Sequence, residues 1–389
     1  RINTNENEAS NEYRFKADYT KPLGEKGKLE AGIQSRIDRE KEEYLFERYD
    51  TAAKEWVNND KYSSSMDFKR EIHSAYTTVS SKIGPIEYML GVRGEYTNRE
   101  IDHAKVDKPY ILNRFDFFPS GHFSYTLFDE SQLMASYSRR INRPNGRDLD
   151  PFESYRDQYT IRVGNPALKP EYTNSYEVSY VKHVGKSFVS LESFYRVTND
   201  AITHLNELRA DNILYETTVN LNNDYSLGGE LMGNISFAEW LLLNTSVSVY
   251  RYKIESDSNE GYITRESTNI DGRFNSTFKF SPASRMQLTG TYQGPSVSAQ
   301  GETKGMFYTN VSYRQDFWAK KLTATLSVQD ILGTATRKGS SNGTNFISTY
   351  SFKREPRVLM LTLSYKINNY KMDESASENN EMNFNEGSF

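Results

Sequence analysis

The residue types that most often carry catalysis or bind metals form no pattern of that kind in this sequence. The chain has no cysteine, which excludes thiolate chemistry and cysteine-ligated zinc. The histidines are His73, His103, His122, His183 and His204, and no two of them have the i, i+2 or i, i+4 spacing of a zinc site. Neither a Gly-x-Ser-x-Gly sequence nor a glycine-rich phosphate loop is present. We therefore expect no metal, no cofactor and no enzyme. Catalysis would need an acid, a base and a nucleophile that converge from distant segments.

Arginine and tyrosine side chains gather instead in one long polar stretch, residues 141–171. Arginine offers charge-assisted hydrogen bonds and tyrosine offers a stacking face, which suits an anionic or sugar-like ligand. The candidate ligand-binding residues are Arg143, Arg147, Tyr155, Arg156 and Tyr159. The alternative is structural: these charges pair with acidic neighbours such as Asp148, Asp150 and Glu153 and pack the loop onto the rest of the chain.

Alternation of apolar and polar residues with a period of two dominates the rest of the chain. In residues 358–367 the apolar set is Leu359, Leu361, Leu363, Tyr365 and Ile367, and the intervening set includes Thr362, Ser364 and Lys366. Residues 88–96, 285–292 and 321–328 repeat the pattern. Helical spacing is nearly absent, so we expect an antiparallel all-β chain with less than ~10% helix.

The composition is unusual for a chain of 389 residues. Only 36% of the residues are apolar, whereas aromatic residues reach 13%. Disordered chains are poor in aromatic residues, so this chain folds, but around something other than a thick apolar core. A polar lumen with a thin apolar outer surface fits, because only every second strand residue needs to be apolar. No apolar run approaches the ~18 residues of a membrane helix.

The formal net charge of −4 comes from the C-terminal end. The residues after Lys371 include five acidic residues and no base, so the remainder carries −4 + 5 = +1. Such a nearly neutral chain has no electrostatic footprint for nucleic acid.

The lengths of the connections separate a membrane barrel from a soluble β-sandwich, whose strands also alternate. The alternating segments run to about 10 residues or more, the length that a tilted strand needs to cross a bilayer. Short turns are expected near 21–27, 82–85, 128–131, 184–186, 237–239, 281–284 and 318–320. Long polar connections are expected near 41–66, 99–112, 141–171, 200–223, 254–263, 294–303 and 333–354. Short turns on one side and long loops on the other are typical of a transmembrane β-barrel surrounded by outer-membrane lipid. On this reading Leu359, Leu361, Leu363, Tyr365 and Ile367 face lipid, and Thr362, Ser364 and Lys366 face the lumen.

We count about 14–16 strands. The first, near 12–20, and the last, near 355–368, both run toward the periplasm, so they cannot close a barrel by antiparallel pairing. Either one strand is missed or the chain is part of a larger barrel. The non-Met start favours the second reading, with the export signal upstream. We divide the chain into a loose N-terminal segment 1–11, the barrel portion 12–368 and a disordered periplasmic tail 369–389.

One set of motifs carries a family resemblance. Ser138-Arg139-Arg140-Ile141-Asn142-Arg143-Pro144 is followed by Leu149-Asp150-Pro151-Phe152 and then by Gly164, Asn165, Pro166, Leu168, Pro170, Glu171 and Glu177. This order resembles the mid-barrel signature of TonB-dependent outer-membrane receptors. The weaker match Val328-Gln329-Asp330-Ile331-Leu332 is similar to the family's penultimate V-x-N-L-F signature but departs from it at the last three residues. A tail after Ile367 is more like the Bacteroidetes branch. Glu171 and Glu177 are expected to pair with Arg140 or Arg143 on the lumen side.

The resemblance implies part of a barrel of about 22 strands in the bacterial outer membrane. It also implies TonB-dependent uptake of a small nutrient ligand, such as a siderophore, a glycan or a peptide. The implied partners are a plug domain and the TonB complex, which this sequence does not contain and which would lie upstream. The alternative is a passive pore or a structural outer-membrane protein without energy coupling. The ligand itself does not follow from the fold.

Overall fold

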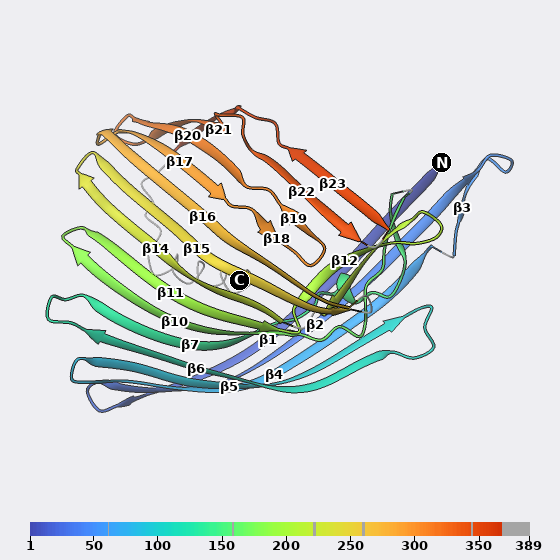
Figure 1. Cartoon of the computed structure of the whole chain (residues 1–389), viewed down its shortest axis with the longest axis horizontal. Helices are drawn as coiled ribbons and strands as arrows, with labels where there is room; N and C mark the ends of the chain where they lie inside the picture. Colours follow the sequence, from blue (N-terminus) through green and yellow to red (C-terminus); the bar gives the residue numbers. More distant parts are fainter. Residues whose placement is uncertain (61, 158, 221–222, 259–260, 344, 368–389) are drawn as a thin grey trace.

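Most of the chain forms one large antiparallel sheet. The computed structural model describes residues 1–367 except 61, 158, 221–222, 259–260 and 344. In sheet order the strands are β1 (Ile2–Leu23), β2 (Gly27–Asp50), β4 (Ser64–Ile83), β5 (Ile86–His103), β6 (Tyr110–Thr126), β7 (Gln132–Asn142), β10 (Glu171–Val184), β11 (Ser187–Asn199), β14 (Asn223–Ala238), β15 (Leu241–Ser258), β16 (Gly261–Ser281), β17 (Ser284–Gln293), β20 (Met306–Phe317), β21 (Leu322–Gln329) and β24 (Val358–Tyr365). β3 (Glu55–Asn58) pairs with the outer end of β2. Figure 1 shows the strands side by side in chain order.

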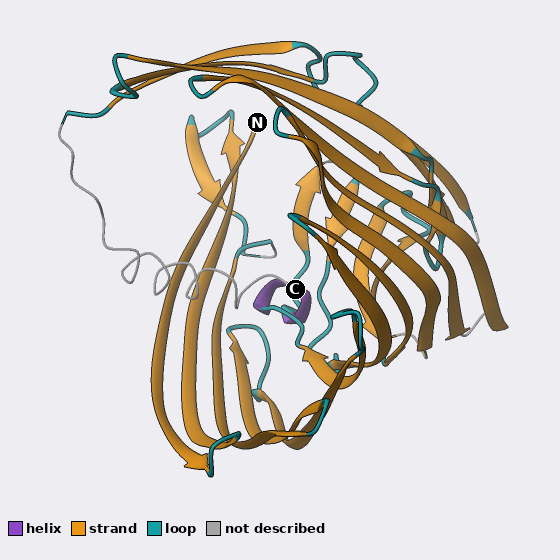
Figure 2. Cartoon of the chain, turned by 90° about the vertical axis from the view of Figure 1, so that its left-hand side faces the viewer, coloured by secondary structure: helices purple, strands orange, loops and turns teal. Residues whose placement is uncertain are grey.

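The sheet is bent into a curved wall, and α1 lies on its concave side (Figure 2). α1 (Gly146–Leu149) is the single helix of the described part of the chain, so the prediction of little helix is confirmed. Among the described residues there is no helix with the length and apolar character of a membrane span.

The two faces of the wall follow from the strand register, because directly paired residues lie on the same face of a sheet. Arg99 of β5 contacts the inner loop through its side chain, which defines the lumen side. We followed the residue pairing from strand to strand, from β5 to β24. It places Thr362 and Ser364 on the lumen side and Leu361 and Leu363 on the outer side. Leu363 is 64% exposed, as an apolar residue that faces lipid must be in the isolated chain.

The connections alternate between short and long, mostly as predicted. The seven short turns all fall where the sequence indicated them. The expected long connection near 254–263 is wrong, because β15 continues to Ser258 and β16 starts at Gly261, with these two residues paired. The prediction of a loose N-terminal segment, residues 1–11, is also wrong. Residues 2–11 form the outer half of β1 and pair with residues 39–48. Neither segment alternates between apolar and polar residues, so the period of two does not mark it as a strand.

The remaining long loops build two small sheets of their own. One consists of β8 (Ser154–Asp157), β9 (Thr160–Arg162), β12 (Ile202–Leu208) and β13 (Leu214–Asn220). The other consists of β18 (Ser296–Val297), β19 (Gly301–Thr303), β22 (Thr336–Gly343) and β23 (Phe346–Lys353). The sequence predicted these stretches only as polar connections.

The large sheet is open within the described residues. Its path runs through fifteen strands, inside the predicted range of 14–16, and β1 and β24 stand at opposite ends of it. Fourteen antiparallel steps leave these two strands pointing the same way, as expected, so they cannot pair antiparallel with each other. The predicted disordered tail 369–389 lies outside the described residues.

Candidate functional site at the barrel mouth

The loop of residues 143–170 folds inward against the lumen wall. Asn145 caps α1, because its side chain accepts a hydrogen bond from the Asp148 backbone N–H at 2.9 Å. Leu149 of α1 and Leu168 farther along the loop are fully buried against Met66, Phe68 and Ile101 of the wall strands β4 and β5. Burial of this apolar cluster stabilises the docked loop, which narrows the mouth of the barrel.

The turn at Gly164, Asn165 and Pro166 is built by close backbone contacts. A Cβ at Gly164 would lie 2.5 Å from the Asp150 carbonyl oxygen, so no larger residue fits there. The N–H groups of Gly164 and Asn165 donate to the carbonyl oxygens of Asp150 and Asp148, both at 2.7 Å. The motif therefore fixes the turn back onto α1, which is a structural role.

Arg99 holds the other side of this turn. Its Nη2 donates to the carbonyl oxygens of Pro166 at 3.1 Å and Leu168 at 3.3 Å, and its Nη1 also reaches Leu168. The side chain is almost completely buried, and no carboxylate pairs with it among the described residues. Two backbone carbonyl groups thus take the place of a counter-ion, which ties β5 to the loop.

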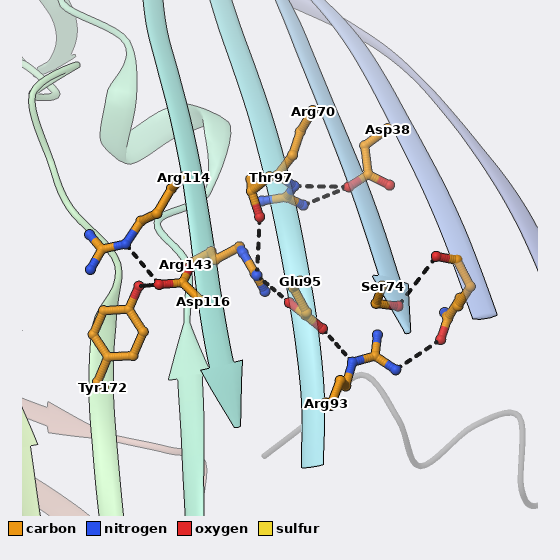
Figure 3. A network of polar contacts seen from close by, with 11 residues as sticks. Asp38, Arg70, Ser74, Arg93, Glu95, Thr97, Arg114, Asp116, Arg143 and Tyr172 are labelled. Carbon is orange, nitrogen blue, oxygen red and sulfur yellow. Dashed lines mark hydrogen bonds and ion pairs between the residues drawn. The ribbon is translucent and has the colours of Figure 1, made fainter. Parts of the chain in front are cut away.

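Buried charges continue along the wall in a network of paired groups (Figure 3). Glu95 accepts hydrogen bonds from Arg93 and Arg143, and Arg143 also donates to Thr97 at 3.3 Å. Farther along, Tyr172 donates to Asp116 at 2.7 Å, and Arg114 donates to the same oxygen. On the other side, Asp38 accepts two hydrogen bonds from Arg70. Among the described residues, Arg143 Nε and Asp116 Oδ2 have no hydrogen-bond partner, but each charged group of the network meets an opposite charge. This charge pairing favours a rigid scaffold over a ligand site.

The structure separates the candidate ligand-binding residues. Arg143 is half-buried and pairs with Glu95, whereas Arg147 and Arg156 form exposed ion pairs with Glu6 at 3.0 Å and Glu216 at 2.7 Å. The Tyr159 side chain is 66% exposed, and the Tyr155 backbone pairs with Ile161 in β9. The hollows beside Arg143 and Arg147 measure only about 10 and 40 Å³. Typical ligand pockets measure about 300–1,000 Å³. Ion pairing therefore accounts for all three arginines without a ligand.

Glu171 and Glu177 do not pair with Arg140 or Arg143, so that expectation is wrong. Glu171 accepts hydrogen bonds from the Asn142 side chain at 2.8 Å and from the Ile202 N–H at 2.7 Å. Glu177 pairs with Arg196 of the next strand at 3.0 Å. Both carboxylates have local partners because β10 lies between β7 and β11 in the sheet.

Asp150 is the titratable group of this loop with the clearest perturbation. Burial raises the pKa of its carboxyl to about 6, and a hydrogen bond from the Phe152 N–H at 3.0 Å opposes that rise only in part. His103 Nε2 lies 3.5 Å from Asp150 Oδ1, and the His103 ring stacks on Phe152. Glu42 and Arg147 line the same small hollow. The carboxyl of Asp150 therefore changes charge near pH 6 at the base of the loop.

Several structurally important residues were missed by sequence reasoning. Arg99 contacts Leu168 of the loop from 69 residues away, Asp116 contacts Tyr172 of β10 from 56 residues away, and Thr97 contacts Arg143. One available signal was the row of polar residues at alternate positions of β5, Arg93, Glu95, Thr97 and Arg99, which is costly on any face except a polar lumen. Across the described ranges no group of three His, Asp or Glu side chains is placed to hold a metal ion.

Comparison with known proteins identifies the architecture. A family model described as the outer membrane protein beta-barrel family matches residues 1–365. Among solved structures, the copper transporter OprC superposes with a TM-score of 0.69 at 13% identity, covering 94% of this chain and 57% of that chain. The ferric yersiniabactin uptake receptor FyuA from Yersinia pestis gives 0.62 at 13% identity, covering 90% and 53%. The ferric citrate transporter FecA in its unliganded form gives 0.64 at 14% identity, covering 92% and 55%. No curated protein sequence matches the chain.

The matched share of this chain is larger than the matched share of each solved structure. The chain is matched almost from end to end, but it spans only 53 to 57% of these three structures. At 13 to 14% identity the likeness shows the fold, and the ligands of those proteins do not transfer with it.

Proposed function

Because the chain belongs to the outer membrane protein beta-barrel family, and so to the bacterial outer membrane, we propose that it is the barrel part of a receptor that imports a small nutrient ligand. The ligand would bind at the outer loops and the upper lumen wall. Import would depend on a plug domain and on the TonB complex, as the motifs near Gly164 suggest. Structural neighbours that are transporters or uptake receptors support this proposal over an enzyme.

The observation that carries the proposal is the docking of the 143–170 loop on the lumen side of the sheet. The 143–170 loop is packed onto the lumen wall through buried Leu149 and Leu168, and the hydrogen bonds of Arg99 hold it there. A passive pore works best with an open water path, whereas a receptor needs outer loops that hold a ligand before import. A docked loop of this kind therefore favours regulated uptake over free diffusion.

We also propose that the exposed end of the loop contacts the ligand, through Arg147, Tyr155, Arg156 and Tyr159. The ion pairs of Arg147 and Arg156 are exposed, and exposed pairs contribute only about 0–1 kcal/mol. A ligand could displace them at little cost. Arg143 is the exception, because its partly buried pairing with Glu95 suits a structural role.

Uptake measurements test the proposal. A strain that lacks the gene and its parent would be supplied with copper(II), ferric citrate and a mixture of oligosaccharides, with and without a proton uncoupler. The receptor proposal expects at least one compound to enter the parent only, and entry to stop when the uncoupler is added. Entry that resists the uncoupler would support the passive pore instead.

A further inference from the structure

A second and much larger hollow lies on another part of the lumen wall. It measures about 440 Å³ and is formed between the wall strands β15, β16, β17 and β20 and the loop strands β18, β19 and β22. Its wall side is polar, with Ser248, Tyr250, Asn269 and Gln293 among the residues that line it. The volume falls within the range of small-molecule sites. We name it the basic hollow, after Arg273, Lys304 and Arg337, which also line it.

These three cations come from three different elements. Arg273 lies on the lumen face of β16, Lys304 follows β19, and Arg337 lies on β22 of the outer-loop sheet. No side-chain hydrogen bond or ion pair joins any of the three to another residue of the described ranges, and all three are exposed. This is the reverse of Arg143, Arg147 and Arg156, each of which meets a carboxylate.

One carboxylate, Asp271, also lines the basic hollow. It accepts a hydrogen bond from Tyr250 Oη at 3.4 Å and one from the Gly294 N–H at 3.2 Å, and it forms no ion pair with Arg273. Three cations against one carboxylate leave a formal charge of 3 − 1 = +2 in the basic hollow. This excess of positive charge attracts anions from solution.

We infer that the basic hollow binds the anionic part of the imported ligand, a small compound that carries carboxylate or phosphate groups. Guanidinium groups bind both kinds of oxyanion through paired hydrogen bonds, and the ammonium group of Lys304 adds a third positive charge. The neutral Ser248, Asn269 and Gln293 side chains are suited to hydroxyl groups on the same molecule. This inference rests on the proposed function, because it names the ligand class of the same receptor.

Lys338 provides a matched control for the cations. It is exposed and adjacent to Arg337 on β22, but it does not line the basic hollow. The test is calorimetric titration of the full-length protein in detergent with four probes: citrate, inorganic phosphate, glucose 6-phosphate and uncharged glucose. The variants are Arg273→Gln, Lys304→Gln, Arg337→Gln, the triple variant and Lys338→Gln. Heat-resistant mobility on a gel verifies that each variant is folded.

At least one anionic probe is expected to bind more tightly than glucose and to weaken as salt is added. Each single substitution in the basic hollow should raise the Kd about tenfold, and the triple variant should abolish binding, because each removes one charge-assisted hydrogen-bonding group. Lys338→Gln should bind like the parent. Preference for citrate would identify a carboxylate ligand, and preference for the phosphate probes a phosphorylated one.

Two results would overturn the inference: no anion binds more tightly than glucose, or Lys338→Gln weakens binding as much as Arg337→Gln. Failure of the site and failure of the proposed function are distinguishable. Anion binding without uncoupler-sensitive uptake contradicts the function and keeps the site. Uncoupler-sensitive uptake that the triple variant leaves unchanged contradicts the site and keeps the function.

Discussion

Both terminal nitrogens of Arg99 donate to the carbonyl oxygen of Leu168, each at 3.3 Å, inside the wall of the barrel. A buried guanidinium without a carboxylate partner is costly unless other acceptors surround it. Here the acceptors belong to the turn that returns the 143–170 loop to β10. The same contact therefore solvates the charge and fixes the loop.

Removing this side chain should release the loop without unfolding the barrel. In Arg99→Leu the carbonyl groups of Pro166 and Leu168 lose their donor, at a cost of about 1.5–3 kcal/mol to loop docking. Limited proteolysis should cut the variant within residues 143–170 faster than the parent, while heat-resistant mobility on a gel stays normal. Arg285→Leu, on the lumen wall at β17, is the control and should leave proteolysis unchanged. Equal protection of the loop in Arg99→Leu and the parent would contradict this role.

Docking of the same loop should weaken as the pH rises. The Asp150 carboxyl has a pKa of about 6 in the folded loop against an ordinary value of 3.8, because burial disfavours its charged form. Between these values the folded loop holds a proton that the undocked loop has lost, so stability falls from about pH 4 to about pH 6 and then levels off. The whole change is at most about 3 kcal/mol.

Proteolysis of the loop at pH 5 and pH 7.5 measures this dependence. The parent should be cut faster at the higher pH, and Asp150→Asn should lose the part of this difference that the Asp150 proton causes. Glu42 lines the same hollow, and burial raises its pKa to about 7, so the double variant Asp150→Asn with Glu42→Gln should be cut at nearly the same rate at both pH values. His103→Gln separates the contribution of the neighbouring imidazole, whose pKa burial lowers below its ordinary value. A pH dependence that is equal in Asp150→Asn and the parent would exclude Asp150 as its cause.

The two faces of β24 predict opposite tolerance to charge. Leu363 lies on the outer face and Thr362 on the lumen face. Arginine in place of Leu363 should cost about 2–4 kcal/mol near the middle of the bilayer, whereas arginine at Thr362 should cost far less. Refolding titrations into lipid vesicles measure both values. Similar costs at the two positions would mean that the register is assigned to the wrong faces.

The exposed end of the 143–170 loop remains open to a role in binding. Arg147→Ala and Tyr155→Ala should raise the ligand concentration needed for half-maximal uptake, about tenfold where a charge-assisted contact is lost. Lys41→Ala, on the outer side of neighbouring β2, should have no effect. Normal uptake in both loop variants would exclude this loop from binding and leave the basic hollow as the remaining candidate.

The alternation in the sequence predicted the sheet wherever one face meets lipid. Leu359, Leu361 and Leu363 show the reason: a lipid-facing row is mostly apolar and the lumen-facing row is polar, so the period of two stands out. Outside the bilayer both faces of a strand contact water, so neither face has to be apolar. Residues 2–11 and 254–258 therefore read as loops, although they pair as strands.

The site was harder to predict, because charge pairing is a property of the folded sheet. The arginine-rich loop was visible in the sequence, but Arg143 meets Glu95 from 48 residues away. A positive side chain looks the same in a sequence whether or not a carboxylate neutralises it. The cations of the basic hollow, which come from β16, the end of β19 and β22, share no local motif that would mark them.

One side-chain amide joins the two outer-loop sheets. Gln300 accepts a hydrogen bond from the Asn206 N–H at 2.7 Å and donates to the Asn206 carbonyl oxygen at 2.9 Å, as a backbone partner in a ladder would. Beside it, Ala299 packs against Ile254 with Leu205 and Val219 of the other sheet. The hairpin that borders the basic hollow is thus fastened to the strands that adjoin the 143–170 loop. A ligand that moves the β18–β19 hairpin or the β12–β13 hairpin must strain or break the contacts of Gln300 and Ala299. We therefore expect the two outer-loop sheets to move as a single unit.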